Sequence, residues 1–384
     1  MTVSGAPELT LTNARIVLSD EVLSGTIRIE GGAITAIDQG SSDQPGAVDL
    51  EGDLLIPGLI ELHTDNLERQ FQPRPKVRWP ADAAMLAHDQ QMVAAGFTTV
   101  CDAVCVGFYG GKRERLDFLD TSLRALDHAR SAGALKADHF LHLRCEVSDP
   151  HAVNLFEPLR DEPTLKLVSF MDHTPGQRQW SDLDRYRTFH RGRTEASEAE
   201  FEEMIQRRLA EQKLYAEKHR QKLLDLVEGL DVVLASHDDT TPDHVDQAAR
   251  EGITLSEFPT TLDAADRAHA KGMGVIMGAP NVVLGGSHSG NVSTVDLARH
   301  DRLDALSSDY VPQSSLLAAL KLADLEGWTL PRAVSCITAT PAAMLGLDDR
   351  GRIEIGRRAD LVRLRRIDDS AAILSVWRQG ERVA

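Results

Sequence analysis

The chain has 384 residues, of which 42% are hydrophobic and 26% are charged, and its formal net charge at pH 7 is −17. This length and composition can bury a sizeable core and favour one large domain with a smaller one. The acidic balance argues against general binding to nucleic acids or to anionic membranes, because both require a dominant basic surface.

The first residues show no basic segment followed by an apolar run, and no stretch is long and apolar enough for a transmembrane helix. We therefore expect a cytoplasmic protein with no membrane partner. The four cysteines, Cys101, Cys105, Cys145 and Cys336, form no CxxC pair. They predict buried free thiols rather than a zinc ribbon or a redox dithiol.

Both ends of the chain predict short β-strands. Residues Leu9 to Ile37 alternate apolar and polar side chains around a turn at Gly31 and Gly32, and the segment after Gly351 repeats this pattern. Neither piece can bury much surface alone. We expect residues 1–53 and 350–384 to pair into one small β-sandwich domain.

The central part of the chain, residues 54–349, alternates short apolar runs with helical patterns, which is typical of βα units around a parallel sheet. The expected strands are Leu54–Leu62, Thr98–Ala103, Phe140–Val147, Leu165–Phe170, Val232–Ala235, Thr254–Glu257, Val275–Met277 and Ala305–Ser307. Eight such strands predict an α/β fold, the (β/α)8 TIM barrel. A long charged stretch around residues 181–230 predicts a helical insertion into this barrel, and a role as lid or interface is the less favoured interpretation.

Polar residues that follow the apolar runs are the first candidates for chemistry, because reactive side chains of such a barrel project from the C-terminal ends of its strands. These candidates are His63, Asp65, Glu146, His173, His237 and Asp309. Imidazoles and carboxylates are ligands for divalent metals such as zinc, manganese or cobalt. Residues two apart on a strand share a side, so His63 and Asp65 can face one metal. The pattern predicts a metal site at the barrel mouth, with room for two ions.

Each candidate ligand also has a plainer interpretation. A lone histidine at a strand end is more often a hydrogen-bonded core residue than a ligand. Glu146 or Asp309 alone could cap a helix or pair with a cation. The recurrence of six such residues after apolar strands favours the metal site.

Several segments resemble a known family. The stretch PGLIELHTDN and the C-terminal pattern LGLDDRGRIEIGRRADLV are similar to the amidohydrolase superfamily. Four segments resemble its α-D-ribose 1-methylphosphonate 5-triphosphate diphosphatases, which act in the carbon-phosphorus lyase pathway of phosphonate degradation: HTDNLERQFQPRPKVRWP, SFMDHTPGQRQW, MGAPNVVLGGSHSGN and LSSDYVP. The similarity runs nearly end to end.

The sequence departs from the commonest superfamily pattern at two points. Asp65 stands where a second histidine usually follows the first strand, although the phosphonate-pathway members share this His-x-Asp. His173 and His237 follow the fourth and fifth predicted strands, whereas the superfamily usually carries these histidines after the fifth and sixth.

The resemblance implies metal-dependent hydrolysis of the ribose triphosphate to α-D-ribose 1-methylphosphonate 5-phosphate and pyrophosphate. It implies two divalent ions with Glu146, or a similar ligand, between them. One ion would be bound by His63 and Asp65, and the other by His173 and His237. Asp309 would lie beside both ions as a ligand and as the general base.

A triphosphate substrate needs cations and backbone N–H groups around it. The candidates for these contacts are Arg74, Lys76, Arg178, His288 and Asn291, the last two within a glycine-rich loop. Without the resemblance, the glycine-rich loop is equally well a turn, and a surface charge is the favoured interpretation of Arg74, Lys76 and Arg178. Four further residues flank the ligands and are expected to orient them or to cap helices: Asn66, Asp172, Asp238 and Asp239.

Two other functions stay open at this point. The same metal site could hydrolyse an amide or cyclic amide, and a barrel without metal could serve as a binding scaffold. The cations Arg74 and Lys76 favour a triphosphate, and the six candidate ligands argue against a scaffold. The expected partner is a small sugar triphosphate. We also expect a homodimer, because large barrel hydrolases often pair, and a functional link to other phosphonate-degradation enzymes.

Overall fold

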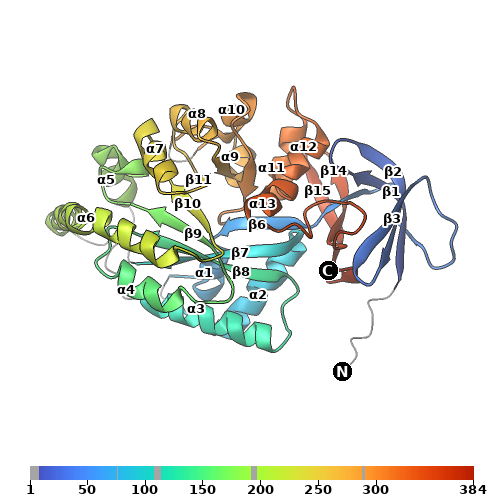
Figure 1. Ribbon diagram of the computed structural model, residues 1–384, viewed down its shortest axis with the longest axis horizontal. Helices are drawn as coiled ribbons and strands as arrows, with labels where there is room; N and C mark the ends of the chain where they lie inside the picture. The colour runs from blue at the N-terminus through green and yellow to red at the C-terminus, as the bar shows by residue number, and fades with distance from the viewer. Residues whose placement is uncertain (1–7, 76, 108–113, 192–196, 288–289) are drawn as a thin grey trace.

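The computed structural model describes residues 8–75, 77–107, 114–191, 197–287 and 290–384. Within these ranges, eight parallel strands form a barrel surrounded by helices, and the two chain ends build a second, mostly antiparallel sheet beside it (Figure 1). The predicted fold class, a (β/α)8 barrel with a small β-domain formed by both termini, is confirmed.

The barrel strands follow one another around the sheet in chain order. They are β6 (Leu59–Thr64), β7 (Phe97–Val106), β8 (Asp138–Glu146), β9 (Leu165–Met171), β10 (Val233–His237), β11 (Leu255–Glu257), β12 (Gly274–Gly278) and β13 (Ala305–Ser307). Their apolar runs are nearly continuous because helices cover one face and the barrel interior the other. The end of β6 meets the segment after β13 through a bridge between Thr64 and Asp309.

The second sheet combines strands from both ends of the chain. They are β1 (Leu9–Val17), β2 (Val22–Glu30), β3 (Ala33–Gln39), β4 (Val48–Asp49), β5 (Leu54–Pro57), β14 (Leu361–Ile367), β15 (Ser370–Arg378) and β16 (Glu381–Arg382). Ile27 from the N-terminal part and Trp377 from the C-terminal part lie in one buried cluster. The two ends therefore complete each other's core.

One predicted strand, Leu54–Leu62, is wrong because the chain changes sheets within it. Its first part is β5, which pairs with β1 and β14, and its second part opens the barrel as β6. Gly58 makes the crossing, where an added Cβ would lie 2.3 Å from Oγ1 of Thr98. The crossing thus lies at Gly58, whereas the sequence placed the domain boundary before Leu54. The domain limits themselves stay a prediction.

Helices cover the outside of the barrel (Figure 1). They are α1 (Asn66–Phe71), α2 (Ala81–Ala94), α3 (Glu114–Ser131), α4 (Ala152–Phe156), α7 (Pro242–Arg250), α8 (Leu262–Ala270), α9 (Ala279–Leu284), α10 (Thr294–Arg299), α11 (Ser314–Ala323), α12 (Leu330–Ser335) and α13 (Ala339–Met344), with a 3-10 turn η1 (Glu157–Leu159). Threonine side chains cap α7, α8 and α12. None of the helices described here is both long enough and apolar enough to cross a bilayer.

Two helices lie between β9 and β10, after the 3-10 turn η2 (Arg178–Trp180). They are α5 (Leu183–Arg191) and α6 (Glu198–Val227), and α6 extends away from the terminal sheet (Figure 1). A capping box of Ser197 and Glu200 starts α6. Tyr186 and Phe201 pack with Trp180 in a small hydrophobic core that is separate from the barrel core. The insertion therefore buries part of its apolar surface within itself.

Candidate active site

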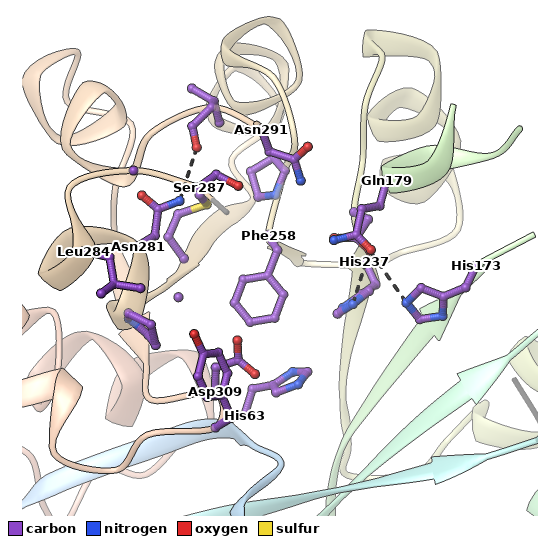
Figure 2. Close-up of a pocket in the computed structure, with 18 of the residues that line it drawn as sticks. His63, His173, Gln179, His237, Phe258, Asn281, Leu284, Ser287, Asn291 and Asp309 are labelled. Atoms are coloured by element: carbon purple, nitrogen blue, oxygen red, sulfur yellow. Dashed lines mark hydrogen bonds and ion pairs between the residues drawn. The ribbon is translucent and has the colours of Figure 1, made fainter. Parts of the chain in front are cut away.

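Four of the six candidate ligands, His63, His173, His237 and Asp309, line one cavity of about 580 Å³ at the C-terminal ends of the barrel strands. The side chains that matter below and line this cavity are His63, Arg144, His173, His237, Asp238, Phe258, Asn291 and Asp309. Figure 2 shows His63 and Asp309 together below Phe258, and His173 and His237 together to its right. The fold therefore brings strand ends that are far apart in sequence to one place.

The first group of possible metal ligands consists of His63, Asp65 and Asp309, whose ligand atoms lie within 4.8 Å of one another. His63 is the next-to-last residue of β6, Asp65 is the N-cap residue of α1, and Asp309 follows β13. His63 Nε2 lies 3.8 Å from Asp65 Oδ1. Burial, and then the negative charge of Asp65, raise the pKa of Asp309 to about 6. Three acceptor groups facing one another in this way form a place suited to a cation.

The second group consists of His173, His237 and Asp238, again within 4.8 Å of one another. Asp238 Oδ2 lies 3.7 Å from His173 Nε2 and 3.5 Å from His237 Nε2. These separations are long for hydrogen bonds. Ligand atoms about 2.1 Å from a tetrahedral ion are about 3.4 Å from each other, so this donor set fits a divalent metal.

Glu257, which the sequence analysis did not select, links the two groups. Its Oε1 accepts a hydrogen bond from His63 Nδ1 at 2.8 Å, and its Oε2 accepts one from His237 Nδ1 at 2.9 Å. Burial alone would raise the pKa of Glu257, but the charges and hydrogen bonds of the surrounding imidazoles outweigh it and hold the pKa well below the usual range. Glu257 closes a predicted strand, and its place at the strand end could have identified it.

Glu146, a predicted metal ligand, lies behind His173 and does not line the cavity. Its Oε2 accepts from His173 Nδ1 at 2.7 Å, and its Oε1 accepts from the His173 backbone N–H and from Ser148. Glu146 thus orients His173, and its role as a metal ligand stays a prediction. The structure keeps His173 and His237 after the fourth and fifth strands, and the sixth strand ends in Glu257.

Two further buried residues stabilise the first group and were missed from the sequence. Arg144 on β8 donates from Nη1 to Asp65 Oδ1 at 2.6 Å, and it is the only lysine or arginine among the described residues that line the cavity. Glu61 on β6 accepts from the backbone N–H groups of His63 and Ser308, both at 2.9 Å. Burial raises the pKa of Glu61 to about 7. Neither residue follows an apolar run, so the strand-end rule could not find them.

The predicted substrate contacts are only partly at the cavity. Asn291 lines it, Arg74 is exposed and does not line it, and Arg178 is buried beside β10. Arg178 Nη1 donates to the backbone oxygen of His237 at 2.9 Å and to the carboxylate of Asp239. The other two, Lys76 and His288, lie outside the described residues.

The four residues expected to orient ligands have separate positions. Asp238 belongs to the second group, and Asn66 lies within 2.9 Å of His88 Nδ1. Asp172 accepts from the Thr174 backbone N–H, and Asp239 contacts Arg178 and Ser236. Only Asp238 contacts candidate ligands through its side chain in the interactions described here.

No protein-family model matches the chain. It is 45% identical over 375 residues to the α-D-ribose 1-methylphosphonate 5-triphosphate diphosphatase of Escherichia coli K12, across 97% of this chain and 99% of that protein. A solved amidohydrolase structure matches with a TM-score of 0.62 and 16% identity over 98% of this chain and 99% of the other. N-acetylglucosamine-6-phosphate deacetylase from Pasteurella multocida matches with a TM-score of 0.64 and 13% identity over 98% and 100% of the two chains. The two solved structures share the fold.

Proposed function

Since the chain belongs to the family of the α-D-ribose 1-methylphosphonate 5-triphosphate diphosphatase, we propose that it is a metal-dependent hydrolase of this triphosphate in phosphonate degradation. The products would be α-D-ribose 1-methylphosphonate 5-phosphate and pyrophosphate. The observation that carries the proposal is the sequence similarity to the Escherichia coli enzyme over almost the whole of both chains. The cavity at the C-terminal mouth of the barrel is the place where such a fold carries out its chemistry.

The two ligand groups support a centre with two divalent ions. One ion would be held by His63, Asp65 and Asp309, and the other by His173, His237 and Asp238. These nitrogen and oxygen donors suit zinc, manganese or cobalt. Such ions, when bound, lower the pKa of water and neutralise phosphate oxygens.

Asp309 is our candidate for the general base. The backbone N–H of Asp309 donates to the His63 carbonyl, and the carbonyl of Asp309 accepts from the Asp65 N–H. Its side chain is only partly buried and lines the cavity. A carboxylate oxygen of Asp309 would accept the proton of the attacking water as the bond between the α- and β-phosphates breaks and pyrophosphate leaves.

Arg144 supports a substrate of high negative charge. Its Nη1 is bound to Asp65, whereas its Nε is buried and has no hydrogen-bond partner among the described residues. Because Arg144 lines the cavity, we assign the guanidinium donors that face the cavity to phosphate oxygens. Arg74, Lys76, Arg178, His288 and Asn291 stay proposed contacts, and Arg178 has the weakest support because it already binds the end of β10.

The cellular setting is part of the same proposal. All four cysteines are free and three of them are buried, which fits a reducing compartment such as the cytoplasm. The homodimer and the functional link to other phosphonate-degradation enzymes stay predictions.

The decisive experiment is turnover of the ribose triphosphate by the metal-loaded protein, with pyrophosphate and orthophosphate measured separately and a cyclic amide as comparison. Metal-dependent release of pyrophosphate is expected. Orthophosphate alone would move the attack to the terminal phosphate. Turnover of the amide without turnover of the triphosphate would contradict the proposed substrate. It would not contradict the barrel fold or the two groups of metal ligands.

A further inference from the structure

One carboxylate connects the two groups of candidate metal ligands. Glu257 binds His63 of the first group through Oε1 and His237 of the second group through Oε2, at 2.8 and 2.9 Å. Glu257 is fully buried at the end of β11, where its backbone pairs with His237 on one side and with Ile276 on the other. The bridge between the two imidazoles is therefore anchored in a strand that is paired on both sides.

Glu257 determines which nitrogen of each ring can bind a metal. A carboxylate only accepts hydrogen bonds, so Nδ1 of His63 and Nδ1 of His237 both carry hydrogen. The lone pair of each ring then lies on Nε2, the atom that faces Asp65 in the first group and Asp238 in the second. One residue thus sets the tautomer required at both positions.

The packing around the two rings preserves this arrangement. The rings are stacked, with centroids 5.7 Å apart and an angle of 18° between their planes. Phe258 packs against both, with centroid distances of 5.0 Å to His63 and 5.4 Å to His237. Because Phe258 follows Glu257 directly, a single short segment after β11 fixes both imidazoles.

We propose that Glu257 is a positioning residue shared by the two metal positions, so that its loss weakens the binding of both ions rather than of one. This inference rests on the two-ion centre of the proposed function. An outer partner of a metal-bound imidazole typically changes metal affinity by about 10- to 100-fold. Because the two oxygens of Glu257 bind different imidazoles, removing Glu257 lowers the metal affinity of both positions.

Glu146 provides a matched comparison within the same site. It is also a buried glutamate at a strand end, and its Oε2 binds the Nδ1 of His173 at 2.7 Å. His173 belongs to the second group alone. The same substitution, glutamate to alanine, therefore removes a shared partner in one variant and an unshared partner in the other.

The test uses the full chain, stripped of metal and titrated with Zn²⁺ by calorimetry and with Co²⁺ by visible absorption, with bound metal counted by mass spectrometry. Alanine removes both acceptor oxygens, so we expect Glu257→Ala to lose about 10- to 100-fold in affinity for both ions and Glu146→Ala to lose it for one. The visible absorption of Co²⁺ at both positions should need higher metal concentrations in the Glu257 variant, and the absorption at one position should do so in the Glu146 variant. Wild-type affinity for either ion in Glu257→Ala would overturn the proposal.

A second measurement needs no substitution of Glu257. In the metal-free protein, ¹⁵N NMR of the histidine rings should show hydrogen on Nδ1 of both His63 and His237, with assignments from His63→Gln and His237→Gln. A ring with hydrogen on Nε2 and none on Nδ1 would contradict the proposed role. These readouts do not involve turnover, so a protein that shows them but leaves the triphosphate intact would disprove only the proposed substrate.

Discussion

Asp309 joins the proposed chemistry to the closure of the barrel. Its carbonyl accepts from the Asp65 backbone N–H at 2.8 Å and from Thr64 Oγ1 at 3.0 Å, while its backbone has a left-handed φ of 55°. Asparagine tolerates this conformation about as well as aspartate. A change to asparagine therefore removes a base while leaving the local shape in place.

We expect Asp309→Asn to lower kcat by about 100- to 10,000-fold, because general-base catalysis typically contributes that much. Most of the bound metal should remain, since an amide oxygen can still occupy the ligand position. The measurement is pyrophosphate release together with metal content. Asp43→Asn, at an exposed position of the terminal domain, is the control. Full activity in Asp309→Asn would show that another group takes the proton.

Arg144 is the second residue whose position predicts a kinetic effect. Hydrogen bonds to charged groups are worth about 1.5–3 kcal/mol, so Arg144→Ala is expected to raise KM for the triphosphate by about 10- to 100-fold. Inhibition by inorganic tripolyphosphate should weaken in parallel. Arg124→Ala removes a highly exposed arginine on α3 and is the control. Unchanged inhibition by tripolyphosphate in Arg144→Ala would argue against a phosphate contact.

At the scale of elements, a buried polar cluster joins α2, β7 and β8, and none of its members lines the cavity. Asp102 accepts from His88 Nε2 at 2.7 Å and from His139 Nδ1 at 2.8 Å. His139 Nε2 donates onward to Asp89 at 3.2 Å. The cluster satisfies buried polar groups between a helix and two strands, and its state depends on pH.

Burial alone would lower the pKa of His139, but the charge and hydrogen bond of Asp102 outweigh it and raise the pKa to about 9. The folded protein therefore binds this proton more tightly than the unfolded chain, whose histidine pKa is about 6.5. The resulting stabilisation is complete below pH of about 6.5 and is lost as pH rises through about 9.

Urea denaturation from pH 6 to 9.5 should show the free energy of unfolding falling by roughly 2–3 kcal/mol more in the wild type than in His139→Gln. Taking the difference between the two proteins removes the contributions of the other titrating groups. Parallel curves would mean that His139 is neutral in the folded state.

For the whole molecule, metal removal should affect the barrel mouth and spare the core. Asp65, Asp238 and Asp309 belong to the two ligand groups, so their negative charges lie close together when no cation is bound. A buried apolar cluster that includes Ile60, Leu167 and Ile276 contains none of these ligands. Binding energy that is lost on chelation appears as lost stability.

We expect chelation to stop turnover and to lower Tm by on the order of 5 °C, with an unchanged far-UV circular dichroism spectrum. Zn²⁺ or Mn²⁺ should restore both properties. If the protein contains no metal, cannot be loaded with metal and has the same Tm with and without chelator, the result would favour the scaffold interpretation.

The sequence by itself determined the fold class and most strand positions. A parallel strand that is covered on both faces needs an apolar run, and the alternation of such runs with helices can be read locally. The rule that side chains project from strand ends then placed His63, His173, His237 and Asp309 around one cavity. The segment Leu54–Leu62 was misassigned because both of its halves are apolar, and only strand pairing shows that they enter different sheets.

Only the tertiary structure decided which polar groups contact each other. Glu257, Arg144 and Glu61 act through hydrogen bonds to residues from distant parts of the sequence, and local sequence contains no record of those partners. The same holds for Glu146, whose oxygens bind His173 rather than face the cavity. Hydrogen bonds depend on distance and direction in space, whereas sequence patterns report only burial and strand direction. The barrel and the position of its site could therefore be predicted from the sequence, whereas the hydrogen bonds within the site could be assigned only from the folded structure.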